Sequence, residues 1–422
     1  MDRELVNNLV LAARDSSPVD GFTHNHYRYP ARFSPWFART VIELFTEPGD
    51  LILDPFAGGG TTLVEALAHQ RHAIGTDVSS LATFVSEVKT TLLSDREITK
   101  LRAWAEQIPE IINMHRLSLG SVWWEERGYQ KHLDSKETWR LRKAIEQCLL
   151  SASNLRPMQL ERLARCIILR TAQWALDSRK QIPTVQQFRD QIVEYANSML
   201  EGARELKRSA MLCSEHDEPT SVICLNRSVV GLEKDKALVS QPPPKLILTS
   251  PPYPGIHVLY HRWQVDGRKE TPAPFWIANM LDGASPKFYT MGDRKERELR
   301  SYYENVTAAY RSIRQICDRS TIVVQVVAFG DAVWQLPKYL DVMSETGFEE
   351  ILLPGIDDSD DGRLWRNVPN RRWHAEQMGE TPGSREVVLI HRVANVTHPV
   401  LTPLRRPAHL GQGPPHSARQ AP

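Results

Sequence analysis

The chain has 422 residues, 41% of them hydrophobic, and is therefore long enough to bury one large core or two smaller ones. Its formal net charge of +1 at pH 7 excludes the strongly basic profile of a small protein that coats nucleic acid. The five cysteines form no C-x-x-C pair, no apolar run approaches the roughly 18 residues of a membrane span, and the first residues carry no basic leader, so we expect a cytoplasmic protein without a disulfide framework or a metal site.

The first recognisable elements are a strand, a turn and a helix. A short apolar run, 51–53, predicts a buried strand, and Gly58-Gly59-Gly60 turns the chain shortly after it. Thr62 and Glu65 have the spacing of a capping box, in which a hydroxyl and a carboxylate bind free N–H groups at a helix start. We therefore expect a helix to begin there and to run through Ala68.

A second strand, predicted at 73–75, ends at Asp77, 17 residues after Gly60. Glycines let the backbone pass close to a ligand, and a carboxylate at the end of the next strand accepts hydrogen bonds from both hydroxyls of a ribose. Most glycine triplets are structural turns, but this spacing predicts a nucleoside-containing cofactor. The Lys-Ser/Thr of a phosphate-binding loop and a full G-x-G-x-x-G are both missing, which disfavours a bound triphosphate or dinucleotide.

The pattern becomes helical between residues 94 and 210, where almost no strand-like run occurs. Capping-box sequences begin at Ser94 and Thr184 and predict two helix starts. A stripe with helical spacing predicts the core of a helical bundle, and it consists of Leu160, Leu163, Ile167 and Trp174.

The strand and helix alternation then returns and completes an α/β domain. Strands are predicted at 221–225, 245–248, 321–327 and 386–390, with helices at 302–317 and 335–346. The tail beyond Pro399 is rich in Pro, Gly and Arg, and we expect it to be disordered. The predicted parts are the first portion of the α/β domain, a helical insertion, the second portion of that domain and the tail, at 1–93, 94–210, 211–398 and 399–422.

A polar and aromatic loop follows the strand at 245–248. It begins at Thr249 and continues as Ser-Pro-Pro-Tyr, and the carboxyl ends of strands are where α/β proteins bind ligands. Two prolines make the loop rigid and leave it rich in carbonyl acceptors. The Ser hydroxyl oxygen and the first Pro carbonyl would each accept one hydrogen of an exocyclic amine, and the Tyr ring would stack on the base. The alternative is a proline-stiffened surface turn. The predicted catalytic residues are Ser250, Pro251, Pro252 and Tyr253.

The glycine site and this loop together resemble the amino-group DNA methyltransferases. The resemblance rests on Tyr-Pro-Ala-Arg-Phe at 29–33, Asp-Pro-Phe-Ala-Gly-Gly-Gly-Thr-Thr at 54–62, Gly-Thr-Asp at 75–77 and the S-P-P-Y loop, and it covers roughly half the chain. It implies a Rossmann-like class I methyltransferase sheet with an inserted all-α helical segment. It also implies S-adenosylmethionine as the cofactor and DNA as the partner.

The resemblance further implies which residues bind the cofactor. The loop after the first strand would hold the methionine part, Asp77 the ribose, and the segment 29–33 would close over both. Asn226 stands where the family has its adenine contact, usually a Gly-Asp pair, from which this sequence departs. The implied set is Tyr29, Pro30, Asp54, Pro55, Phe56, Ala57, Gly58, Gly60, Thr61, Asp77, Asn226 and Thr249.

Arginines interleaved with tryptophans at 363–373 are candidates for DNA contact, because arginine binds phosphates and guanine edges and tryptophan stacks on bases. The alternative is a hairpin whose arginines pair with protein carboxylates. A second basic stretch, 294–300, is interrupted by glutamates and is explained as a solvated helix start. The predicted DNA-binding residues are Arg363, Arg366, Arg371 and Arg372.

We therefore predict a site-specific DNA methyltransferase that acts on the exocyclic amine of a flipped base. Within the family, Ser at the first loop position goes more often with cytosine N4, and Asp or Asn with adenine N6, so Ser250 favours cytosine. The alternatives, in order, are adenine N6, an RNA guanine-N2 methyltransferase, and an inactive DNA-recognition subunit. The sequence leaves open the recognised DNA site, the oligomeric state and whether a restriction or phage-defence protein is a partner.

Overall fold

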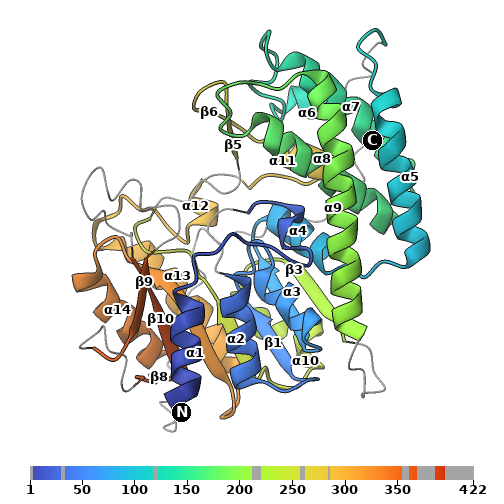
Figure 1. Ribbon diagram of the computed structural model, residues 1–422. Helices are drawn as coiled ribbons and strands as arrows, with labels where there is room; N and C mark the ends of the chain where they lie inside the picture. The colour runs from blue at the N-terminus through green and yellow to red at the C-terminus, as the bar shows by residue number, and fades with distance from the viewer. Residues whose placement is uncertain are drawn as a thin grey trace.

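A mixed β-sheet organises one body of the protein, and a second, helical body lies beside it (Figure 1). The computed structural model describes residues 3–29, 34–116, 122–211, 220–256, 262–283, 286–353, 361–367 and 385–394. In this part of the chain, the strand order is β3-β2-β1-β4-β7-β10-β8, with β9 paired to β10. The strands are β1 (Leu51–Asp54), β2 (His72–Asp77), β3 (Val222–Asn226), β4 (Leu246–Thr249), β7 (Ile322–Ala328), β8 (Phe348–Glu350), β9 (Leu364–Asn367) and β10 (Arg385–Val393).

The direction of the parallel strands brings their carboxyl ends to a single edge of the sheet. Strands β3, β2, β1, β4 and β7 run parallel to their neighbours, whereas β10 is antiparallel to β7, β8 and β9. The carboxyl ends of the parallel strands therefore meet at one edge, where α/β proteins bind ligands. This sheet confirms the predicted fold class, a Rossmann-like α/β sheet interrupted by a helical segment.

Helices cover both faces of the sheet because alternate strand residues point to opposite sides. Leu53 and Ile247 pack with the helices α13 and α14, while Ile52 and Leu248 pack with α1 and α2 on the other face. The sheet-covering helices are α1 (Arg3–Ala13), α2 (Pro35–Phe45), α3 (Thr61–Ala68), α4 (Ser80–Thr90), α13 (Arg300–Ile316) and α14 (Ala332–Glu345), and short elements connect them at η1 (His24–His26), η2 (Leu232–Lys234), α10 (Lys236–Val239), α12 (Pro286–Tyr289) and η3 (Arg297–Leu299).

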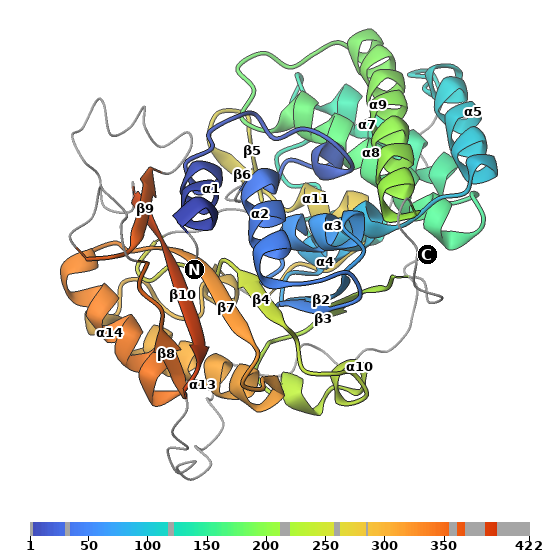
Figure 2. The same ribbon diagram turned by 60° about the horizontal axis from the view of Figure 1, so that its bottom comes forward.

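The helical body contains more than the predicted insertion (Figures 1 and 2). Its helices are α5 (Asp95–Ile111), α6 (Val122–Glu126), α7 (Trp139–Ala152), α8 (Met158–Leu176) and α9 (Val185–Met211). The segment after the catalytic loop, which comprises β5 (Trp263–Val265), β6 (Lys269–Thr271) and α11 (Ala273–Ala278), shares the same hydrophobic core. A boundary at residue 211 therefore does not separate the helical body from everything that follows it.

The capping boxes predicted at Ser94 and Thr184 are confirmed, since each hydroxyl accepts a backbone N–H three residues on and the residue there returns the bond. The one predicted at Thr62 and Glu65 is wrong. Gly60, two residues before Thr62, is the N-cap of helix α3, and the Thr62 hydroxyl donates to the Leu248 carbonyl at 3.3 Å.

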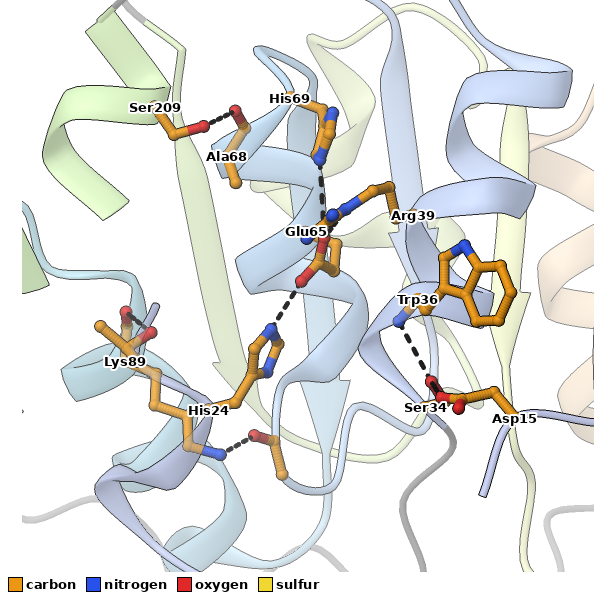
Figure 3. Close-up of polar contacts among 12 residues, drawn as sticks. Asp15, His24, Ser34, Trp36, Arg39, Glu65, Ala68, His69, Lys89 and Ser209 are labelled. Atoms are coloured by element: carbon orange, nitrogen blue, oxygen red, sulfur yellow. Dashed lines mark hydrogen bonds and ion pairs between the residues drawn. The ribbon is translucent and has the colours of Figure 1, made fainter. Parts of the chain in front are cut away.

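Glu65 instead lies fully buried among basic groups (Figure 3). Its carboxylate contacts His24 Nε2 at 2.6 Å, Arg39 Nε at 3.2 Å and His69 Nε2 at 3.6 Å. Burial alone would raise the pKa of Glu65, but hydrogen bonds from the two histidines and the charges of His24 and Arg39 outweigh it and lower the pKa to about 2. The charged glutamate thus fastens η1 and α2 to α3.

Within the described residues, no helix is long and apolar enough to cross a bilayer.

Replacing Glu65 with glutamine should lower the free energy of unfolding by about 3 kcal/mol at pH 7, because the buried carboxylate that pairs with His24 and Arg39 is lost. Because folding lowers the pKa of Glu65, its stabilisation is present above the unfolded pKa of 4.5 and fades as the pH falls toward about 2. Urea unfolding at several pH values measures both effects. Glu43→Gln, which removes an exposed partner of His69, is the control and should cost less than about 0.5 kcal/mol. Equal losses in the two variants would contradict the prediction.

Candidate active site

The glycine turn after β1 is shaped by close neighbours. Gly58 and Gly60 have φ angles of +48° and +74°, which side chains other than glycine rarely adopt. A Cβ atom on Gly59 would lie 2.8 Å from Tyr29 Cβ, and one on Gly60 would lie 2.7 Å from Ser86 Oγ. The three glycines are therefore required by geometry, and they leave the turn backbone close to whatever binds there.

Buried polar groups hold this turn from behind. Lys89, on α4, is fully buried and donates from Nζ to the Gly59 carbonyl at 2.8 Å, as Figure 3 shows. Ser86 Oγ donates to the Gly58 carbonyl at 3.3 Å. We did not predict Lys89 as a site residue. It stands four residues after Val85 on the buried face of α4, and a lysine in an apolar stripe was the available signal.

Two aspartates end the strands on either side of the turn. Asp54, at the end of β1, is 2% exposed and accepts hydrogen bonds from Thr249 Oγ1 at 2.7 Å and from Phe56 N at 3.2 Å. Asp77, at the end of β2, is half-buried and accepts from Gly58 N at 2.9 Å. Burial raises the pKa of both carboxyls to about 6. Asp77 also accepts from Ser79 N at 2.8 Å, and because a carboxylate oxygen can accept two hydrogen bonds, each Asp77 oxygen has the capacity to accept one more from a hydroxyl.

Tyr29 and Asn226 flank this pair of aspartates. The Tyr29 ring lies against the glycine turn, and burial together with the nearby Asp77 raises the pKa of its phenol well above 10.0. Asn226 is exposed and donates from its amide to the Asp77 carbonyl at 3.0 Å and to Val78 at 3.2 Å, so it fixes the end of β2. Pro30 lies outside the described residues.

The structure thus gathers the predicted cofactor residues that it describes at the carboxyl edge of the sheet. Most stand in the turn between β1 and α3, and the others end β2, β3 and β4 or approach from the N-terminal segment. They are Tyr29, Asp54, Pro55, Phe56, Ala57, Gly58, Gly60, Thr61, Asp77, Asn226 and Thr249.

The predicted catalytic loop begins directly after β4 at the same edge. Ser250 Oγ lies 3.0 Å from the Val326 carbonyl and 3.1 Å from the hydroxyl of Tyr253. Tyr302, on α13, donates to the Pro252 carbonyl at 2.8 Å. The Tyr253 side chain is only 8% exposed, and burial raises its pKa well above 10.0. The loop is therefore held rigidly by β7 and α13, and the tyrosine ring faces mostly inward.

The predicted DNA-binding arginines have protein partners where the structure describes them. Arg363 pairs with Glu350 at 2.7 Å and with Asp361 at 3.3 Å. Arg366 is buried, contrary to the prediction that it faces DNA, and its guanidinium contacts Glu386 at 2.6 Å. Both observations match the alternative in which arginines pair with protein carboxylates. Arg371 and Arg372 lie outside the described residues.

Another basic stretch lies beside the catalytic loop. The segment 293–300 leads into α13, whose Tyr302 holds Pro252, and Leu299 approaches Gly255, where a Cβ would lie 3.5 Å from Leu299 Cδ1. Its basic side chains are exposed, and they are Arg294, Lys295, Arg297 and Arg300. From the sequence alone, we explained this stretch as a solvated helix start. Its proximity to the predicted loop depends on tertiary packing, which local sequence pattern does not show.

Solved structures resemble the chain only distantly. A putative rRNA methylase from Clostridium thermocellum gives a TM-score of 0.31 at 8% identity, covering 84% of this chain and 95% of that one. The rRNA methyltransferase aviRa from Streptomyces viridochromogenes gives 0.31 at 11% identity, covering 93% of each chain. Scores this low carry no argument, so the fold assignment rests on the strand order.

The chain is also similar in sequence to known proteins. Residues 13–83 match the family N6_N4_Mtase, described as DNA methylase. The Type II methyltransferase M.MvaI of Kocuria varians is 34% identical over 110 residues, which make up 24% of each protein. M.MjaII of Methanocaldococcus jannaschii is 34% identical over 79 residues, 19% of this chain and 14% of that protein. The matched stretches thus span about a quarter or less of these relatives. The family match and these two relatives confirm the predicted resemblance to the amino-group DNA methyltransferases.

Proposed function

We propose that the protein transfers a methyl group from S-adenosylmethionine to the exocyclic amine of a base in DNA. The observation that carries the proposal is the 2.7 Å hydrogen bond between Thr249 and Asp54. This bond joins the end of β4, which Ser250 follows directly, to the end of β1, from which the glycine turn leads. An amine held at Ser250 would therefore lie close to a cofactor held at the turn, and positioning of this kind accelerates transfer reactions.

The residues at this edge suit the cofactor. The tight glycine turn would hold its methionine part, Asp77 would accept hydrogen bonds from the ribose, and Tyr29 would cover both. When bound, S-adenosylmethionine supplies an electrophilic methyl group. The carboxylate of Asp77 already lies 2.9 Å from Gly58 N, so the ribose and methionine subsites are joined through one side chain.

The acceptor side of the site suits a flipped base. The Ser250 hydroxyl oxygen and the Pro251 carbonyl would each accept one amino hydrogen, and the base must leave the duplex to reach them. By the family tendency, Ser250 favours cytosine N4, and adenine N6 is the nearest alternative. An RNA guanine-N2 methyltransferase and an inactive DNA-recognition subunit are further alternatives, and stacking of the base on Tyr253 remains a prediction.

We also propose that DNA phosphates bind to the exposed basic side chains of the segment 293–300, near the proposed catalytic loop, because basic side chains contribute most of the affinity for DNA. Arg371 and Arg372 remain proposed contacts, whereas the buried Arg366 does not. We place the activity in the cytoplasm, in keeping with the free thiols of Cys148, Cys166, Cys224 and Cys317. A restriction or defence partner remains a proposal.

Methyl transfer from labelled S-adenosylmethionine to DNA and to RNA, followed by mass spectrometry of the nucleosides, tests the function directly. We expect label in DNA, as N4-methylcytosine. Detection of N6-methyladenine instead would support the same class of enzyme, with adenine rather than cytosine as the target base. Label in RNA alone would overturn the proposal, and failure to bind the cofactor would support the inactive subunit.

Ser250→Ala should reduce kcat by about 10²- to 10³-fold, because it removes an acceptor that aligns the amine in the transition state. The dissociation constant of the cofactor should remain unchanged, since Thr249 and Asp54 keep their contact. Single-turnover kinetics and calorimetry measure the two quantities. Ser240→Ala, at an exposed serine after α10, is the matched control. Loss of cofactor binding in Ser250→Ala would show that the two subsites are not separate.

Cofactor affinity should weaken as the pH falls below about 6, because protonation of Asp77 removes an acceptor for the ribose hydroxyls. Asp77→Asn should weaken binding roughly tenfold or more at pH 8 and reduce this pH dependence, leaving the share that comes from Asp54. Calorimetric titrations between about pH 5 and pH 8 provide the measurement. The exposed Asp341, replaced with asparagine, serves as the control. Full affinity in Asp77→Asn would remove this residue from the site.

A further inference from the structure

A buried line of polar groups runs from the N-terminal helix to the catalytic loop. Arg366, on β9, donates from Nη1 to the Ala13 carbonyl at the end of α1, at 3.2 Å. Its Nε and Nη2 atoms lie 2.8 and 2.6 Å from Glu386 Oε2 on β10. The other oxygen of Glu386 lies 2.7 Å from the Tyr253 hydroxyl, which in turn lies 3.1 Å from Ser250 Oγ. Helix α1 lies beside β9 in Figure 1. The line of polar groups therefore connects α1, through β9 and β10, to the loop after β4.

The chemistry of these groups fixes the direction of the hydrogen bonds from Arg366 to Glu386 and from Tyr253 to Glu386. A guanidinium has only donors and a carboxylate only acceptors, so Arg366 donates to Glu386. Tyr253 must then donate its single proton to Glu386, and its oxygen can only accept from Ser250. The other neighbour of Ser250, the Val326 carbonyl, is also only an acceptor. Whether the Tyr253 oxygen or the Val326 carbonyl receives the Ser250 proton, Ser250 has no proton left to donate to a ligand.

We propose that Glu386 and Arg366 are positioning residues that fix the Ser250 hydroxyl as a hydrogen-bond acceptor for the amino group of the target base. The inference rests on the proposed function. An amino group presents hydrogens to its surroundings, and a hydroxyl that pointed its own proton at the amine would compete for the lone pair that must attack the methyl group. The negative end of the line also polarises the Ser250 oxygen, because hydrogen bonds in a chain strengthen one another.

Burial argues that this line serves more than packing. Arg366, Glu386 and Tyr253 are 6%, 4% and 8% exposed. A buried ion pair is costly to desolvate and is commonly no more stabilising than apolar side chains of the same size. Its oriented dipoles, however, supply a fixed field at the serine that apolar side chains would not supply.

Glu386→Gln tests the direction of the bonds with little change in shape. Since Arg366 offers only donors, the carbonyl of the new amide must face it, and the NH2 group then faces Tyr253. Tyr253 would have to accept that bond and turn its proton toward Ser250, which reverses the line. We expect kcat for DNA methylation to fall roughly 10- to 100-fold, with the cofactor dissociation constant unchanged.

Two double variants separate this effect from a loss of packing. In Glu386→Gln with Arg366→Met, the amide is free to turn its oxygen toward Tyr253, and we expect part of the lost kcat to return. In Tyr253→Phe, the line is already broken, so adding Glu386→Gln should lower kcat no further. Thermal unfolding of every variant shows whether it is folded. A double variant with Arg366→Met that is as slow as Glu386→Gln, or wild-type kcat in Glu386→Gln, would overturn the proposal.

Glu349→Gln is the matched control, because Glu349 pairs with Arg392 at 3.1 Å across β8 and β10 on the exposed side of the same sheet. Its kcat should equal that of the wild type. Neutron diffraction of the deuterated wild-type protein gives a reading that needs no activity. Deuterium between Tyr253 and Glu386 supports the proposed order, and deuterium from Tyr253 directed at Ser250 overturns it. Failure of the wild type to methylate DNA would overturn the function, while the neutron result still decides the proton order.

Discussion

The hydrogen bond between Thr249 and Asp54 joins two motifs that lie 195 residues apart in the chain. It forms because β1 and β4 are parallel neighbours, so that both strands deliver their last residue to the same edge. Thr62, on the helix after the glycine turn, reinforces the join through the Leu248 carbonyl. The proposed site depends on this contact, since it joins the strand before the proposed catalytic loop to the strand before the proposed cofactor turn.

The long helical body leaves this contact undisturbed because of where it enters the sheet. It interrupts the chain between β2 and β3, and β3 is an outer strand of the sheet. Helix α4 leads into the helical body and α9 returns from it, while β1, β4 and β7 remain adjacent. The segment after the catalytic loop then crosses to the helical core, where Trp263 Nε1 donates to Tyr27 at 3.0 Å. Tyr27 precedes the glycine turn in the chain and Trp263 follows the Ser-Pro-Pro-Tyr loop, so the second body brings together segments from both sides of the two motifs.

The sequence was sufficient where a feature depends on neighbours in the chain. The turn of three glycines and the strand end at Asp77 follow from local pattern and are as predicted, and the strands before Asp54 and Thr249 end one residue later than predicted. Pattern failed where a side chain finds distant partners. Glu65 was expected to cap its own helix, but His24 and Arg39 come from other elements, and nothing in the spacing of Thr62 and Glu65 reveals them. Arg366 was placed wrongly for the same reason. A cluster of basic residues in a sequence suggests an exposed surface, and its buried partner, Glu386, is known only from the structure.

The residues that the sequence misplaced or did not single out share a physical property. Lys89, Glu65 and the pair of Arg366 with Glu386 are buried charges, and each one costs desolvation that an apolar residue would avoid. All of them lie behind the two loops: Lys89 holds the glycine turn, Glu65 anchors its helix, and Glu386 holds Tyr253. Charges fixed in this way need no reorganisation during a reaction. Their position behind the glycine turn and the proposed catalytic loop keeps both in one arrangement.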